Sequence, residues 1–243
     1  MKILVANDDG IEAEGLRYLA EFASSLGEVT VAAPKYQQSA KSHCVIIDRP
    51  FEVVELDTFD YIGARAYRID ATPADCVRFS LDYFPDRFDF VFAGINSGLN
   101  IGNDISYSGT CGICFEAGLS GVRSVAFSAK SKHIKQAAEY LRPVWDYLLS
   151  KDAFSHCGIF NVNIPPEPKG ILLTTQGREY YKDKFLPAEE PNMYYAEYTL
   201  ARSPETVINP SVDIDAVLLG YCSVTPLSTR RTDYKAYEEM TFN

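Results

Sequence analysis

Residues 2–10 read KILVANDDG, and this stretch decides the fold. A short apolar run that ends abruptly in polar residues and glycine is typical of a buried parallel strand, whose functional groups lie in the loop that follows it. A helical pattern comes next, with Leu16 and Leu19 on one face. Residues 28–33 (EVTVAA) then predict a second strand, which Pro34 ends. This order indicates a βαβ unit.

The same alternation of strands and helices continues through the first two thirds of the chain. Further strands are predicted at residues 44–56, 61–69, 88–93 and 124–128. Helices are predicted to start at Thr72-Pro73-Ala74-Asp75 and to span residues 109–119 and 133–149, the last with a kink at Pro143. The rhythm predicts an α/β fold in which helices cover both faces of a mostly parallel sheet.

The pattern changes after about residue 165. Strands are predicted at 170–175, 193–200 and 223–227, and a short helix at 213–219. The segment between the first two strands is rich in Tyr, Pro and charge, which favours protruding hairpins that serve as oligomer contacts or cover the edge of the core. We expect a single domain over residues 1–243, with a core at about 1–165 and C-terminal hairpins and an oligomerisation arm at about 166–243.

Composition and charge exclude several classes of protein. The 243 residues are 47% hydrophobic and carry a formal net charge of -10, so we expect a folded core and no binding to duplex nucleic acid, whose phosphates repel an acidic surface. No run reaches the roughly 18 apolar residues of a membrane helix, and no export signal precedes Asp8. We therefore expect a cytoplasmic protein with no membrane partner and with its six cysteines reduced.

Asp8 and Asp9 directly follow the first predicted strand. Two adjacent carboxylates are costly to hold together unless a cation or protons neutralise them, and hard oxygen ligands suit Mg²⁺, Mn²⁺ or Ca²⁺. An ordinary acidic turn, or a cap of the next helix, accounts for the pair equally well when it is taken alone.

Two further predicted strand ends carry polar residues. Ser39 lies just after the second strand, and Asn96 lies in the glycine-rich segment 94–100 after the strand at 88–93. Asn96 offers an oxygen to a metal or an amide to a phosphate. For Ser39 a turn cap, and for segment 94–100 a plain glycine turn, is the simpler interpretation of each taken singly. Their interest is positional, because neighbouring strand ends open onto one crevice.

Ser108, Gly109 and Thr110 stand where a helix is predicted to begin. The N–H groups and positive dipole end of a helix N-terminus bind anions such as phosphate, although Ser108 or Thr110 equally suits the role of N-cap. No glycine-rich dinucleotide fingerprint follows the first strand, and no P-loop motif is present, which argues against dinucleotide binding and NTP hydrolysis.

With these residues in view, the chain resembles the SurE family of survival-protein nucleotidases. The matching blocks keep their order and spacing from residue 3 to residue 227: residues 3–10, Ala33-Pro34, Gln38-Ser39, Thr72-Pro73-Ala74-Asp75-Cys76-Val77, residues 94–100, Tyr107-Ser108-Gly109-Thr110 with Glu116, residues 161–165 and residues 223–227. One block would carry little information, whereas the whole set is highly specific.

The resemblance implies a Rossmann-like, three-layer core with an extended C-terminal part. It implies hydrolysis of nucleoside 5′- and 3′-monophosphates with one divalent ion per subunit, Mg²⁺ or Mn²⁺ (or Ca²⁺). The ion would be held by Asp8, Asp9, Ser39 and Asn96, and the phosphate by Ser108, Gly109 and Thr110 together with Asn96; Asp8, Asp9 and Asn96 are thus the candidate catalytic residues. The resemblance also implies a homodimer or homotetramer assembled through the C-terminal segments.

The chain departs from the family pattern at four positions. Alanine stands at 40, 71 and 117 where glycine is usual, and Val212 stands where threonine is common. If any of these positions needs a positive φ, an alanine there costs on the order of 1 kcal/mol or more. We expect effects on loop geometry and rate, since no proposed ligand is lost.

Cys111 and Cys114 form a Cys-x-x-Cys pattern, but zinc sites of that type need a second pair, so we interpret both as packed core residues. His43 lies near Ser39, begins an apolar stretch, and has no obvious partner in the sequence. We expect the tyrosine pairs at 180–181 and 194–195 to serve packing or oligomer contacts rather than to stack a nucleobase.

Two rival functions remain open. A haloacid-dehalogenase-type phosphatase forms an aspartyl-phosphate, but it wants Asp-x-Asp after the first strand, whereas here the carboxylates are adjacent. A non-enzymatic phospho-receiver module also has an acidic pair there. It needs an acceptor Asp at its third strand end, where this chain carries Asn96.

Overall fold

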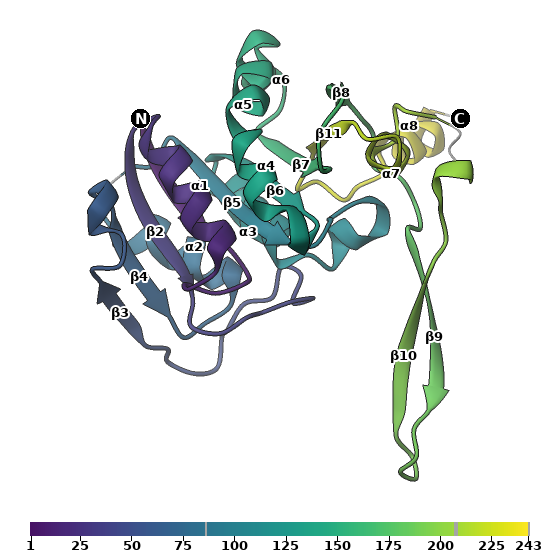
Figure 1. Cartoon of the computed structure of the whole chain (residues 1–243), viewed down its shortest axis with the longest axis horizontal. Helices are drawn as coiled ribbons and strands as arrows, with labels where there is room; N and C mark the ends of the chain where they lie inside the picture. Colours follow the sequence, from purple (N-terminus) through teal and green to yellow (C-terminus); the bar gives the residue numbers. More distant parts are fainter. Residues whose placement is uncertain (86, 207–208, 243) are drawn as a thin grey trace.

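The computed structural model describes residues 1–85, 87–206 and 209–242, and across these residues a nine-stranded sheet forms the centre of the molecule (Figure 1). In spatial order its strands are β3 (Val53–Leu56), β4 (Arg65–Ile69), β2 (Glu28–Pro34), β1 (Lys2–Ala6), β5 (Phe90–Ser97), β6 (Arg123–Ala129), β7 (Ile159–Ile164), β11 (Cys222–Leu227) and β8 (Ile171–Leu173). The six strands from β4 to β7 are mutually parallel, while β3 and β11 run antiparallel to their neighbours β4 and β7. The predicted α/β class with a parallel-rich sheet is confirmed.

Helices cover both faces of the sheet. One face packs against α1 (Glu14–Ser24), α4 (Ile134–Glu139) and α5 (Leu141–Ser150), with Leu16 and Trp145 in the same apolar cluster as Phe92 of the sheet. The other face packs against α2 (Pro73–Tyr83) and α3 (Gly109–Leu119), where Val77 and Ile113 join Leu4. Because these strands are apolar on both faces, they are held between two layers of helix, as parallel strands are in general.

Two predicted helix signals have a clear structural basis. Thr72 caps α2, its hydroxyl accepting a hydrogen bond from the Asp75 N–H at 3.1 Å. The helix predicted at 133–149 is broken between α4 and α5. Pro143 has no N–H to donate to the carbonyl of Glu139, the last residue of α4. The kink is therefore confirmed. The described residues also form the short helix α6 (Ala153–His156) and the 3₁₀ turns Asp60–Ile62, Gly102–Ser106, Ser131–His133 and Pro204–Thr206.

The strand predicted over residues 44–56 is mostly wrong. Only Val53–Leu56 pairs as β3, and the preceding residues form an irregular loop. In this loop the N-terminus of α2 replaces a strand partner: Thr72 Oγ1 donates to the Cys44 carbonyl at 2.7 Å, and the Ile46 N–H donates to Asp75 Oδ2 at 2.9 Å. β-propensity was overridden by these side-chain bonds.

The C-terminal part forms a long hairpin and two helices. β9 (Tyr181–Pro187) and β10 (Tyr194–Leu200) pair antiparallel and project away from the rest of the chain, and α7 (Asp213–Leu218) and α8 (Tyr234–Phe242) lie near the base of the hairpin (Figure 1). The predicted C-terminal hairpin is confirmed, although no strand bounds were predicted for β9 and no helix for α8, because their polar, charged sequences carry weak periodicity. No helix in the described ranges is long and apolar enough to cross a membrane.

Candidate active site

The candidate ligands meet because their strands are neighbours. β1 lies between β2 and β5, and all three run parallel, so the loops after Ala6, Pro34 and Ser97 leave the sheet at one edge. The N-terminus of α3 reaches the same edge. Segments nearly a hundred residues apart in the chain thus converge there, as the sequence predicted.

The loop that carries the two aspartates is held by its own first residue. Asn7 is fully buried, and its side chain bonds twice to Gly10: Nδ2 donates to the Gly10 carbonyl at 2.9 Å, and Oδ1 accepts from the Gly10 N–H at 3.2 Å. Gly10 has φ +103°, which only glycine adopts readily. The loop geometry at Asp8 and Asp9 is therefore fixed before any ligand binds.

Asp8 lies against the start of α3. Its Oδ1 accepts a 2.5 Å hydrogen bond from the Thr110 hydroxyl, and a Cβ on Gly109 would lie only 2.8 Å from Asp8 Oδ2. The side chain is buried, and this burial raises the pKa of Asp8 to about 6; the Asp9 charge acts in the same direction, while the Thr110 bond opposes it. A buried carboxylate with a second one beside it is an arrangement that a bound cation would stabilise.

Asp9 is half-buried and is held from both sides. Its Oδ2 accepts from the Ser97 N–H at 2.9 Å, and its Oδ1 accepts from Gln37 Nε2 at 3.1 Å. The first bond ties Asp9 to the residue next to Asn96, and the second ties it to the segment that leads to Ser39. The two aspartates are thus linked through hydrogen bonds to the other strand ends.

Ser39 is exposed, and its position relative to Asp8 is set by its neighbour. The Gln38 N–H donates to the Asp8 carbonyl at 2.7 Å, and the Ser39 hydroxyl makes no hydrogen bond to the residues that the structure describes. The next residue, Ala40, has φ +57°, so this departure from the family's glycine does place an alanine in a left-handed conformation. The other three departures, Ala71, Ala117 and Val212, have no positive φ.

Asn96 lies at a bulge in the β5–β6 pairing, where the register shifts between Ala93 and Asn96. Gly94 makes the bulge possible, since a Cβ there would lie 2.3 Å from the Phe127 carbonyl. The Asn96 amide nitrogen donates to the Gly98 carbonyl at 2.7 Å, which fixes the amide plane. Among the described residues, none donates to its Oδ1, which leaves that oxygen available to a cation.

The predicted phosphate loop is a well-formed helix start. Ser108 is the N-cap of α3, and its Oγ accepts from the Cys111 N–H at 3.1 Å. Because Ser108 Oγ caps the helix and Thr110 Oγ1 is bonded to Asp8, both hydroxyls already have structural roles. The Ser108 N–H donates to the Asp104 carbonyl at 3.1 Å, so an anion at this position would be bound by the N–H groups of Gly109 and Thr110.

A buried asparagine network behind the site was missed in the sequence. The side chains of Asn161 and Asn163 both donate to the Asn100 carbonyl, at 2.7 and 3.0 Å, and Asn163 Oδ1 accepts from the Asn100 N–H at 2.8 Å. This network fixes the end of the segment that starts at Asn96. Its signal is visible in β7, where Asn161 and Asn163 alternate on one face of an otherwise apolar strand.

The histidine interpretation is corrected, and the cysteine interpretation is confirmed. His43 has a partner: its Nε2 lies 2.7 Å from Glu116 Oε2 of α3, a residue 73 positions away. Cys111 and Cys114 are free and fully buried, and burial raises the pKa of both thiols, that of Cys111 to about 12. Neither is a reactive thiolate.

The donor set suits a hard divalent ion. The candidate ligands are two carboxylates, an amide oxygen and a hydroxyl, which are oxygen ligands that Mg²⁺ and Mn²⁺ accept. Across the described ranges, no three His, Cys, Asp or Glu side chains cluster as a metal site, so an ion at Asp8 and Asp9 would depend on neutral oxygens as well.

Comparison with known proteins identifies the family of the chain. The family model for survival protein SurE matches residues 3–183. The chain is 38% identical over 251 aligned positions to 5′-nucleotidase SurE of Clostridium botulinum (strain Loch Maree / Type A3), covering 98% of this chain and 97% of that one. It is 32% identical to 5′-nucleotidase SurE of Vibrio cholerae (strain ATCC 39315), covering 99% of this chain and 96% of the relative.

The fold is similar as well. The crystal structure of the SurE protein from Aquifex aeolicus superposes with a TM-score of 0.82 at 31% sequence identity, covering 100% of this chain and 99% of that one. This chain therefore matches SurE proteins over nearly its whole length in sequence and in fold. The protein belongs to the SurE family.

Proposed function

We propose that this chain is a nucleotidase that hydrolyses nucleoside 5′-monophosphates, and also 3′-monophosphates, to nucleoside and phosphate with one divalent ion. The observation that carries the proposal is the contact between Asp8 and the start of α3, where a Cβ on Gly109 would lie 2.8 Å from Asp8 Oδ2. The proposed cation site and the proposed anion site therefore adjoin, as a metal-dependent phosphomonoesterase requires. The relatives named as 5′-nucleotidases support the same substrate class.

The residues divide the work as follows. Asp8, Asp9, Ser39 and Asn96 hold the ion, which when bound supplies charge neutralisation on the phosphoryl group and lowers the pKa of water. The N–H groups at Gly109 and Thr110 orient the phosphate, Ser108 caps the helix that presents them, and Asn96 supports the phosphate from the β5 side. The Thr110 hydroxyl keeps the Asp8 carboxylate in one rotamer.

The site favours this chemistry over the rival functions. An aspartyl-phosphate mechanism needs a nucleophilic carboxylate that can be approached in line, but the Asp8 carboxylate is buried and bonded to Thr110, and both oxygens of Asp9 accept hydrogen bonds. A receiver module needs an acceptor aspartate where β5 ends, and Asn96 stands there. Absence of a trapped phospho-enzyme is therefore expected.

We further propose that the chain works as a homodimer or homotetramer assembled through its C-terminal segments. The hairpin exposes Phe185, Tyr194, Tyr195 and Tyr198, and an apolar surface of this kind is stabilised when a partner covers it.

The decisive experiment measures phosphate release from the 5′ and 3′ isomers of AMP, GMP, CMP and UMP, with EDTA, Mg²⁺ or Mn²⁺, in parallel with Asp9→Asn. We expect metal-dependent release that falls at least about a hundredfold in the variant, because a ligand and its charge are lost. A folded wild-type protein that releases no phosphate with any of these metals would refute the proposal.

A further inference from the structure

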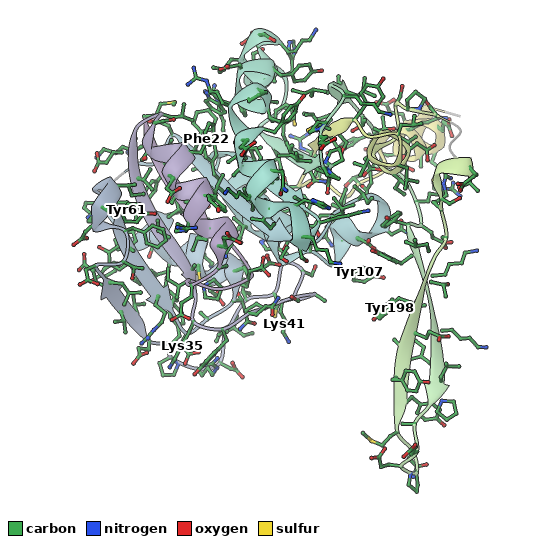
Figure 2. All side chains as sticks on the ribbon, viewed as in Figure 1. Phe22, Lys35, Lys41, Tyr61, Tyr107 and Tyr198 are labelled. Carbon is green, nitrogen blue, oxygen red and sulfur yellow. The ribbon has the colours of Figure 1, made fainter. Side chains whose placement is uncertain are left out.

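The segment that carries Ser39 is strained and has few bonds of its own. We call residues 37–44 the Ser39 loop. Two of its non-glycine residues, Ala40 and Ser42, have left-handed φ values of +57° and +54°. Such conformations persist only where surrounding contacts hold them. Lys41 of this loop and Tyr107 of the loop before α3 both lie along the lower side of the core in the view of Figure 2.

The first anchor of the Ser39 loop is made by Ser42. Its N–H donates to the Tyr107 carbonyl at 2.9 Å, and its hydroxyl donates to the Ser106 carbonyl at 2.7 Å. The loop backbone also touches α3, because a Cβ on Gly112 would lie 2.3 Å from the Ser42 carbonyl oxygen. The loop therefore rests directly on the helix whose first turn forms the proposed phosphate site.

The second anchor is the pair of His43 and Glu116. The His43 Nε2 donates to Glu116 Oε2 at 2.7 Å, and the two side chains are only 19% and 12% exposed. The His43 ring also packs on Phe115, with centroids 6.3 Å apart. Glu116 lies one helical turn after Gly112, so the pair and the backbone contact lie on the same side of α3.

We propose that His43 and Glu116 are a positioning pair, which holds the Ser39 loop in the conformation that presents Ser39 to the metal. The inference rests on the proposed function, because it takes Ser39 as a metal ligand. Helix α3 fixes Asp8 through Thr110 and fixes the Ser39 loop through Glu116. One rigid element thereby sets both sides of the cation site, and neither His43 nor Glu116 needs to touch the ion.

A merely structural pair would behave differently. An exposed ion pair contributes little to stability, and its loss would leave the affinity of the folded protein for metal unchanged. The pair here is mostly buried. His43 lies four residues after Ser39, in a loop that the Gln38 and Gln37 bonds tie to the aspartates. Breaking the His43–Glu116 pair should therefore make Ser39 more mobile without unfolding the protein.

The test measures Mn²⁺ binding to metal-free protein by titration calorimetry, without substrate. His43→Phe keeps a ring against Phe115 and removes the hydrogen bond, while Glu116→Ala breaks the pair from the other side. We expect both to weaken Mn²⁺ binding about five- to tenfold, the loss that one buried hydrogen bond supports. Glu116→Gln can still accept from His43 and is the matched control, with affinity within about twofold of wild type.

Two further readouts do not depend on turnover. Amide hydrogen exchange in residues 38–44 should be faster in His43→Phe and unchanged in Glu116→Gln. Ser39→Ala should weaken Mn²⁺ binding strongly in the wild-type background and much less in His43→Phe. In His43→Phe the Ser39 hydroxyl is already displaced and contributes little to Mn²⁺ affinity.

Clear outcomes would overturn the inference. Folded His43→Phe and Glu116→Ala proteins that bind Mn²⁺ like wild type, or an equal effect of Ser39→Ala in both backgrounds, would refute the positioning role alone. A wild-type protein that binds no Mn²⁺ and releases no phosphate would instead refute the proposed function, and the positioning role with it.

Discussion

The loops that follow β1, β2 and β5 leave the sheet at one edge, which we call the loop edge and which carries Asp8. This loop edge and the hairpin of β9 and β10 depart from ordinary burial in opposite directions. At the loop edge, charged and amide side chains are buried, whereas on the hairpin, aromatic side chains such as Phe185 and Tyr198 are 69% and 67% exposed. Burying a charge is unfavourable unless an opposite charge or hydrogen bonds compensate it, and exposing a large apolar surface is unfavourable unless a partner covers it.

Each region fits one of the two proposals. The buried aspartate pair fits the proposed cation, and the exposed aromatic hairpin fits the proposed contact with another chain. If this is correct, changes at the loop edge should alter metal binding and chemistry but not assembly. Changes on the hairpin should alter assembly while leaving the metal affinity of each subunit intact.

The largest effect is expected from Asp8→Asn. Phosphate release should fall by at least about a hundredfold because a ligand charge is removed. At neutral pH and in EDTA, the same variant should be more stable than wild type by about 1–3 kcal/mol, because the buried charge, reflected in a pKa raised from 3.8 to about 6, is gone. Urea denaturation of the two metal-free proteins measures the gain. A metal-free variant less stable than wild type would contradict this account of the loop edge.

The pH dependence of that stability difference has a defined sign. A carboxyl whose pKa is higher in the folded state binds its proton more tightly there, so ionised Asp8 destabilises the fold above a pH of about 6. The advantage of Asp8→Asn should therefore shrink as the pH falls from about 6 and vanish below about 3.8. Since a proton competes with the ion, Mn²⁺ affinity of wild type should also fall below about pH 6. A pH-independent difference would contradict the assignment to Asp8.

The next largest effect is expected from Gly109→Ala. The new methyl group would lie 2.8 Å from Asp8 Oδ2 and 2.9 Å from Asp8 Cβ, so the carboxylate or the helix start must move. We expect Mn²⁺ affinity and kcat/KM to fall about tenfold or more, because small displacements of positioned groups have large effects on rate. Gly158→Ala is the matched control, since nothing lies within 4 Å of a Cβ there. Equal behaviour of the two variants would show that the close approach at Gly109 is unimportant.

On the hairpin, a double change of Phe185 and Tyr198 to serine should reduce the size of the assembly. The expected reason is the loss of apolar surface covered by a partner, which obligate interfaces need. Light scattering after size exclusion measures the mass, and Mn²⁺ titration checks that each subunit keeps its site. Ile47→Ser, at a residue that is 87% exposed on the core, is the control and should change neither. Unchanged mass in the double variant would contradict a hairpin interface.

Much of the loop edge could be predicted from the sequence because short, contiguous motifs identify the strand ends that form it. An apolar strand followed by Asp8 and Asp9, and a glycine-rich stretch around Asn96, identify strand ends, and parallel strands bring such ends together. The His43–Glu116 pair and the Asn100 network could not be predicted in the same way, since they depend on how loops pack across α3 and β7.

The loop at residues 44–52 and strand β9 of the hairpin were harder to predict from the sequence, for different physical reasons. Residues 44–52 have high β-propensity, but Thr72 and Asp75 at the start of α2 take their backbone groups as hydrogen-bond partners. β9 carries lysines and an aspartate with little alternation, because neither of its faces is buried within this chain. Hydrophobic periodicity reflects burial, so it gives no signal for a strand that its own chain leaves exposed on both faces.

The smallest effect is expected from Ala40→Gly, and it bears on the exposed side of the metal site. Ala40 has φ +57°, where alanine is disfavoured relative to glycine by about 1 kcal/mol. The gain is partly offset because glycine adds freedom to the unfolded chain, so we expect the free energy of unfolding to rise by about 0.5 kcal/mol or less.

Ser42→Gly relieves a similar φ of +54° but also removes the hydroxyl that donates to the Ser106 carbonyl, and it should therefore destabilise the protein. Denaturation curves of the two variants distinguish strain from anchoring. If Ala40→Gly stabilises the protein and leaves Mn²⁺ affinity unchanged, the loop conformation is set by its anchors and not by the residue at position 40. If Mn²⁺ affinity falls instead, the alanine itself restricts the loop, and the fixed geometry at Asp8 does not extend to Ser39.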